Sequence, residues 1–281
     1  MKSIIMLGLI FFFWATLAGG NPSETGQSGY ISQLGTASMD WTRGRIVAGG
    51  AASFELNRED PAHQAIIAER EAKIRAIRNL YDSLGEIYLN SSVTLDRVQD
   101  RDQDVMRDVS TMVQQAVVVD KVSVSGSRHL VEVFVMLDLW DEHVRMFMPE
   151  DLFITPEISE ADSEDALLPG DCVIYVDALD VDAAPAVIPS ITDEHGNILF
   201  RASVLGSGKN AGTSRISYVG AAHQGRKFKT TPNDGQTMWI RPEKSSGRFH
   251  TDLQLDSQGA EKFKSVVSST RDDCSVKIIL E

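Results

Sequence analysis

Residues 60–89 have the sequence DPAHQAIIAEREAKIRAIRNLYDSLGEIYL, which is typical of a long helix. Asp60 followed by Pro61 marks its start, because Asp accepts hydrogen bonds from the first backbone N–H groups and Pro needs no partner at the first helical position. Apolar residues then recur at steps of three, four and seven: Ile67, Ile74, Ile77, Tyr81, Leu84 and Tyr88. The pattern predicts an amphipathic helix that buries this stripe against a sheet.

The segments around this helix predict one α+β unit over residues 43–149. Residues 45–54 contain two glycines within a strand-like pattern, and residues 102–115 have the spacing of a second amphipathic helix. Residues 117–124 and 129–139 are rich in β-branched residues and flank a short Ser-Gly-Ser connection, which predicts a hairpin. The expected order is therefore strand, helix, helix, strand, strand.

A second small α/β domain is predicted over residues 172–281. Residues 150–171 are acidic and contain two prolines, so we expect them to form a linker. Beyond it, the expected elements are a strand at 173–176, a hairpin within 188–205, a strand at 237–241, a helix at 257–269 and a closing strand at 275–280. Residues 211–234 are rich in glycine and are predicted to be irregular.

The N-terminus predicts export. Residues 1–20 combine Lys2, an apolar run and small residues at the end, as in a secretory signal peptide. The apolar run is short for a membrane span, and no cysteine lies nearby to carry a lipid. Residues 21–42 are mostly polar and predict a flexible lead-in. We therefore expect a periplasmic protein with no direct membrane anchor after signal cleavage, associated with the outer membrane through partners if at all.

The charge balance and the cysteines limit the partners and the covalent structure. A net charge of −13 argues against nucleic acid and against an anionic membrane surface as partners. Cys172 and Cys274 each precede a predicted strand, and export would expose both to an oxidising compartment. A disulfide forms if the two strands are parallel neighbours; two unpaired, buried thiols are the alternative.

No motif predicts catalysis. Residues 206–212 (GSGKNAG) resemble a phosphate-binding loop, but Asn210 replaces the required Ser or Thr. Asp177, Asp180 and Asp182 favour a solvated strand end over a metal site. The histidines show no metal-ligand spacing: His63, His129, His143, His195, His223 and His250. We therefore expect no enzyme activity, with no catalytic, cofactor-binding or metal-binding residues and no cofactor.

Short stretches in both halves carry a family resemblance. In the first unit these are residues 46–52 (IVAGGAA), 68–80 (AEREAKIRAIRNL) and 131–137 (VEVFVML). This unit resembles the Lpp-twenty-like family of bacterial envelope lipoproteins, whose fold also appears in the flagellar disk and ring proteins FlgP and FlgT. Residues 173–178 (VIYVDA) and 185–200 (PAVIPSITDEHGNILF) are similar to the α/β domain that often follows it. The chain departs from the family because it lacks the lipid-bearing cysteine.

The resemblance implies a structural role. Proteins of this kind act as scaffold and ring-forming parts of the cell envelope and offer no catalytic residues to carry over. We expect a non-enzymatic periplasmic protein that assembles with itself, as a homo-oligomer, or with envelope or flagellar ring proteins. The alternative is a periplasmic protein that binds a small ligand or polysaccharide through the glycine-rich segment near residues 211–235.

Overall fold

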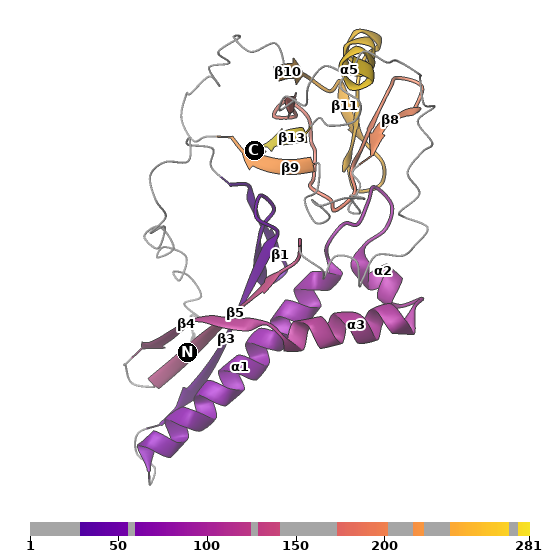
Figure 1. Cartoon of the computed structure of the whole chain (residues 1–281). Coiled ribbons are helices and arrows are strands. Elements are labelled where there is room, and N and C mark those ends of the chain that lie inside the picture. Colours follow the sequence, from indigo (N-terminus) through magenta and orange to yellow (C-terminus); the bar gives the residue numbers. More distant parts are fainter. Residues whose placement is uncertain are drawn as a thin grey trace, which may run out of the picture.

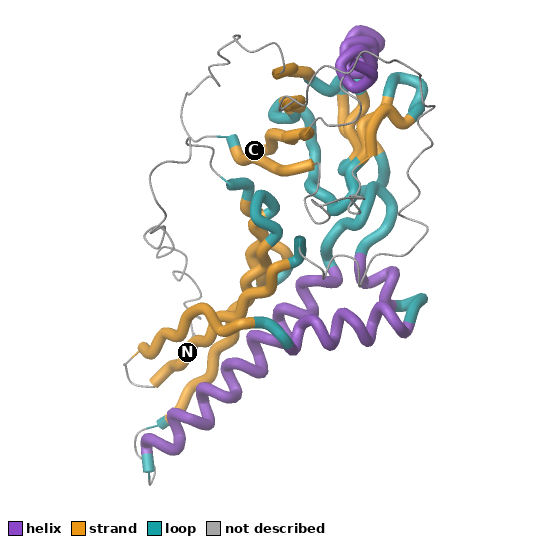
Figure 2. The backbone as a smooth tube through the Cα atoms, in the orientation of Figure 1, coloured by secondary structure: helices purple, strands orange, loops and turns teal. Residues whose placement is uncertain are grey.

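The computed structural model describes residues 29–55, 60–124, 129–140, 173–201, 216–221, 237–269 and 275–281. Helices and three sheets form the structure, so the predicted α+β class is confirmed (Figures 1 and 2). The predicted signal peptide at 1–20, the acidic linker at 150–171 and both cysteines lie outside the described residues.

The N-terminal unit is a five-stranded antiparallel sheet with helices on one face (Figure 1). In spatial order its strands are β1 (Ile31–Leu34), β2 (Ala37–Asp40), β3 (Arg45–Phe54), β5 (His129–Asp138) and β4 (Val117–Val124). Its helices are α1 (Pro61–Gly85), the short α2 (Leu95–Gln99) and α3 (Gln103–Gln114). The central strands β3 and β5 pair along their whole lengths, from Arg45 opposite Asp138 to Phe54 opposite His129. The observed order is three strands, three helices and two strands, so the predicted order is present with β1, β2 and α2 added to it.

The prediction of a flexible lead-in over residues 21–42 is wrong for its second half. Residues 31–40 form the β1–β2 hairpin, which turns at Gly35 with a positive φ of 53° and adds two strands to the sheet. Ala37 and Met39 alternate with polar residues and are buried. The alternating pattern is only a few residues long, and these side chains are buried because β2 pairs with β3. The polar composition of the segment alone therefore predicted a flexible lead-in.

Small residues form the contact between α1 and β3. The helix buries Ala68, Ala72, Ala76 and Leu80. A Cβ atom added to Gly50 would lie 2.2 Å from the backbone oxygen of Ala72 and 2.2 Å from the backbone nitrogen of Ala76. The helix backbone therefore lies so close to β3 that only glycine fits at this position.

The predicted buried stripe of α1 is consequently wrong at Ile67 and Ile74. Ile67 and Ile74 are 43% and 67% exposed, whereas Leu84 is fully buried. Ile77 and Tyr81 are partly buried against the core. The prediction assumed that the most apolar face is the inner one, but the close approach at Gly50 admits alanine and excludes isoleucine.

The second unit contains two four-stranded sheets. The parallel sheet has the order β10 (Thr237–Ile240), β6 (Val173–Asp177), β13 (Ser275–Leu280) and β9 (Ile216–Gly220). The mixed sheet has the order β11 (Lys244–Ser246), β12 (Asp252–Gln254), β7 (Ser190–Thr192) and β8 (Ile198–Arg201). Helix α5 (Ser257–Ser269) buries Phe263, whose ring centroid lies 6.1 Å from that of Phe200.

Two predictions for this unit have different outcomes. The hairpin within 188–205 is confirmed by the antiparallel pairing of β7 and β8. Its turn is held by Asp193, which accepts hydrogen bonds from the Asn197 side chain and from the backbone N–H groups of Asn197 and His195. These bonds, the one from the Asn197 side chain first, lower the pKa of Asp193 below its ordinary value. In contrast, the irregular segment predicted over 211–234 is wrong at 216–220, where β9 buries Ile216 and Tyr218 beside β13.

Substitution of Gly50 by Ala tests the close contact between α1 and β3. Because the new methyl group meets backbone atoms that cannot rotate away, we expect a loss of about 3 kcal/mol in the free energy of unfolding, measured by urea denaturation. The matched control is Gly49→Ala, whose methyl group has the side-chain ring of Phe134 as its nearest neighbour, at 2.9 Å, and should cost much less. Equal losses for the two variants would contradict this account.

Candidate functional site

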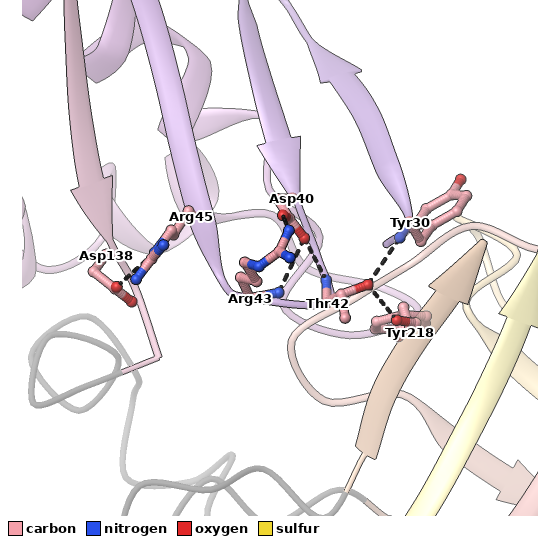
Figure 3. Close-up of polar contacts among 7 residues, drawn as sticks. All are labelled: Tyr30, Asp40, Thr42, Arg43, Arg45, Asp138 and Tyr218. Atoms are coloured by element: carbon pink, nitrogen blue, oxygen red, sulfur yellow. Dashed lines mark hydrogen bonds and ion pairs between the residues drawn. The ribbon is translucent and has the colours of Figure 1, made fainter. Parts of the chain in front are cut away.

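The candidate site is the junction where the first unit meets the second (Figure 3). The Thr42 hydroxyl, just after β2, donates a hydrogen bond to the backbone oxygen of Tyr218 at 2.6 Å and accepts one from the backbone N–H of Tyr30 at 2.8 Å. Asp40 fixes this turn by accepting from the backbone N–H groups of Thr42 and Arg43, each at 3.0 Å. One hydroxyl thus connects two segments that are far apart in the sequence.

Aromatic rings fill the junction behind this hydroxyl. Trp41 is 1% exposed, and its ring packs edge-on against that of Tyr218, with 5.7 Å between the centroids. Tyr30 and Trp140 contact the same pair at centroid distances of 6.4 and 6.3 Å. The Trp41 indole N–H donates to the Ser32 hydroxyl at 2.8 Å, so its polar atom is satisfied in the interior. The cluster therefore contributes apolar burial without leaving the Trp41 donor unpaired.

Tyr218 is the central residue of this cluster. Its hydroxyl donates to the backbone oxygen of Ala186 at 2.8 Å and accepts from the Ala186 backbone N–H at 2.9 Å. Burial raises its pKa far above the ordinary value for tyrosine. The side chain is neutral at every physiological pH, and its role in the structure is packing and hydrogen bonding.

A second set of contacts joins the units at the segment after α1. The backbone N–H groups of Val187 and Ile188 donate to the oxygens of Tyr88 and Leu89 at 2.9 and 2.8 Å. The Tyr88 ring stacks on Phe249, with 4.5 Å between centroids. Buried apolar residues of both units consequently belong to one continuous core.

A cavity of about 430 Å³ lies beside the junction. Its walls come from the β1–β2 hairpin, the C-terminal end of α1, the segment after α1, and Pro185 of the second unit. Glu86 and Asp96 are its charged lining residues, and Trp41 and Tyr88 are its aromatic ones. Carboxylates next to aromatic rings suit an organic cation or a polyhydroxylated ligand.

The acidic residues considered from the sequence lie apart from this cavity. Asp177 forms an ion pair with Arg241 at 3.0 Å, and Asp180 lies 3.7 Å from the same guanidinium. The backbone oxygen of Asp182 accepts a hydrogen bond from the Ser245 hydroxyl. Among the residues that the structure describes, no three His, Cys, Asp or Glu side chains are grouped to hold a metal ion.

The described histidines are likewise dispersed. The His63 backbone N–H donates to the Asp60 side chain at the start of α1, and the His129 ring packs on Phe54. His195 lies 3.6 Å from Glu194. His143 and His223 lie outside the described residues, and His250 contacts Ser245.

The contact between Ser245 and His250 resembles the nucleophile and base of a serine hydrolase. His250 Nδ1 lies 3.2 Å from the Ser245 oxygen. The serine hydroxyl has one hydrogen, and it donates that hydrogen to the Asp182 carbonyl. The two contacts connect Ser245 both to His250 and to the segment that contains Asp182.

Neither comparison with known proteins assigns this site. No model of a known protein family matches the sequence. No curated protein is significantly similar to it. Within the described part of the chain, every helix is too short or too polar to cross a bilayer.

The disulfide between Cys172 and Cys274 remains a prediction, and its premise is confirmed. Strands β6 and β13 are parallel neighbours with Val173 opposite Ser275, the residues that directly follow the two cysteines. The spacing of paired strands falls within the range that a disulfide bridges. We expect peptide mapping of non-reduced periplasmic protein to recover the two cysteine peptides as one linked species. Recovery of both as free, alkylatable peptides would contradict the pairing.

The junction predicts a specific effect of removing the Thr42 hydroxyl. Thr42→Val keeps the shape but removes the donor to Tyr218 and the acceptor for Tyr30, so we expect a loss of about 1–3 kcal/mol in the free energy of unfolding. Thr42→Ser retains the hydroxyl and is the matched control. Urea denaturation measures both, and equal stabilities would show that the hydroxyl does not join the units.

Proposed function

We propose that the protein is a non-enzymatic assembly protein of the bacterial cell envelope, exported to the periplasm, where it forms part of a ring or scaffold such as the flagellar outer-membrane-associated machinery. The main support for an assembly role is the exposed edge of the five-stranded sheet. Strand β4 pairs with β5 on one side only, and the order β1-β2-β3-β5-β4 leaves it at the edge.

The edge is unusually apolar for a strand next to water. Val117, Val118 and Val119 are 61%, 42% and 44% exposed. Native edge strands are normally protected by charge, by short length or by a covering element, whereas this one is eight residues long. An irregularity in register between Val118 and Asp120 and the exposed charges of Asp120 and Lys121 protect its middle, so the unprotected apolar part is Val117 to Val119.

The face of the sheet opposite the helices continues this apolar surface. Val47, Met136 and Val117 stand side by side on β3, β5 and β4, and the first two are partly exposed. This row leads directly to the open edge. Contiguous apolar surface of this kind is typical of contact sites between proteins, and an edge strand supplies unpaired backbone groups to hold a partner.

The envelope location has separate support. The signal-like residues 1–20 favour export, and the resemblance of the first unit to Lpp-twenty-like, FlgP-like and FlgT-like proteins favours a structural part of the envelope. An edge contact between copies is heterologous unless it is two-fold symmetric, and repeated heterologous contacts close into rings when the rotation permits.

The cavity at the junction supports a second candidate function, the binding of a small cation or a polyhydroxylated ligand in the periplasm. Glu86, Asp96, Trp41 and Tyr88 supply the chemistry for it. The glycine-rich segment first suggested for this role lies mostly outside the described residues, and its described part is β9. A protein that is strictly monomeric and never co-purifies with the envelope would favour this second candidate.

Assembly is tested by placing charges on the β4 edge. We expect the wild-type protein to elute as an oligomer in size-exclusion chromatography with light scattering. A double variant, Val117→Lys with Val119→Lys, should shift most of the mass to monomer, because a second strand would bury the new charges.

Two matched controls make this test specific. Val117→Thr with Val119→Thr keeps the β-branched shape and should remain oligomeric. Ile31→Lys places a charge on β1 at the opposite edge, where the native side chain is 59% exposed, and should not change the mass. A wild-type monomer, or a β4 variant that assembles normally, would contradict assembly through this edge. Crosslinking in intact cells then identifies the partner.

A further inference from the structure

A second exposed surface lies on the outer side of α1. His63, Ile67, Arg70, Ile74 and Arg78 follow one another at steps of three and four, so they form one stripe of the helix, here called the outward stripe. It lies opposite Ala68, Ala72 and Ala76, which face the sheet. All five residues of the outward stripe are exposed, Ile74 to 67%.

No described element lies over the outward stripe, which runs from His63 in the first turn of α1 past the middle of the helix to Arg78. Helices α2 and α3 lie near the C-terminal half of α1, where Leu84 is fully buried (Figure 1). The N-terminal half extends away from the second unit with no described element over this side (Figure 2). Ile66, on the flank of the stripe, is also 51% exposed.

The charge of this surface is opposite to that of the whole chain. The chain carries −13, yet the outward stripe contains no acidic residue. Arg70, Arg78 and the flanking Lys73 have no ion-pair partner among the described residues. The acidic residues of this half are already engaged: Glu71 pairs with Arg75, and Glu69 pairs with Lys121 at 2.7 Å. The exposed isoleucines are therefore bordered by the cations of Arg70, Lys73 and Arg78 and by the Glu71–Arg75 ion pair.

We propose that the outward stripe of α1 binds the surface of an anionic phospholipid bilayer. Isoleucine side chains enter the boundary between headgroups and acyl chains, while long basic side chains on both sides reach the phosphates. Both features are needed: cations alone would suit any polyanion, and isoleucines alone would suit any apolar partner. Isoleucines and basic residues alternate on one face of α1. This arrangement matches a bilayer surface, where anionic phosphates lie outside the apolar acyl chains.

The expected strength suits a peripheral contact. Two or three partly inserted isoleucines and three cations give one copy a weak, reversible affinity. Several copies held in one assembly would bind together much more tightly, because each further contact becomes intramolecular. The stripe would thus supply a membrane contact that the sequence does not provide through a lipid-bearing cysteine.

Vesicle co-sedimentation tests the proposal on full-length protein purified from the periplasm, with its N-terminus verified by mass spectrometry. We expect binding to vesicles containing phosphatidylglycerol, weak binding to pure phosphatidylcholine vesicles, and loss of binding as salt rises. Arg70→Gln with Arg78→Gln should weaken binding about 25-fold, on the scale of about fivefold for each cation near an anionic surface. Ile67→Gln with Ile74→Gln should weaken it at least about tenfold.

Matched variants elsewhere separate this site from general charge and hydrophobicity. Arg97→Gln with Arg101→Gln removes two exposed cations near α2, and Ile31→Gln with Ile198→Gln removes two exposed isoleucines; both should bind vesicles normally. No binding by the wild type, equal binding to phosphatidylcholine, or equal losses in these controls would overturn the proposal. Stripe variants that change the oligomeric mass but not vesicle binding would also overturn it and assign the face to a contact between copies. Assembly through β4 is measured independently, so either idea can fail alone.

Discussion

The close approach of α1 to β3 at Gly50 is the constraint on which the N-terminal unit depends. Because the helix backbone lies against the strand, its inner side is limited to alanine for three successive turns, Ala68, Ala72 and Ala76. The larger apolar residues of the same helix then have no place between helix and sheet. They are covered by α2 and α3 near Leu84 and remain exposed at Ile67 and Ile74. One packing distance thus determines both the core and the surface of this unit.

A different kind of constraint joins the two units. The β1–β2 hairpin ends in Trp41 and Thr42, which bring an aromatic ring and a hydroxyl to Tyr218 on β9. Since the backbone of Val187 and Ile188 is bonded at the same time to the segment after α1, the units are held at two separated places. The cavity beside these attachments is lined almost entirely by the first unit, and Pro185 is the second unit's contribution to its walls.

The sequence predicted those elements whose pattern is long and local. Helices α1 and α3 and strands β3, β5 and β13 appear where periodicity places them. Strands β1, β2 and β9 were missed because they are short and lie in segments rich in polar residues or glycine. Strand β9 is also stabilised by β13, a partner distant in sequence. Trp41 was the available signal, since a lone tryptophan in a polar segment is rarely left in water. The inner face of α1 was misassigned because hydrophobicity was weighed without side-chain size.

The sequence likewise does not show how charge is distributed over the surface. A net charge is an average over the chain, and −13 describes only the mean charge that a partner meets at a distance. Within the Debye length of about 8 Å, however, a partner meets only the local charges of the face that it touches. On α1 the acidic side chains are drawn aside into pairs with Arg75 and Lys121, so the face that projects outward is basic. Which partners the protein can bind therefore depends on how packing and ion pairing distribute its side chains over each face of the surface.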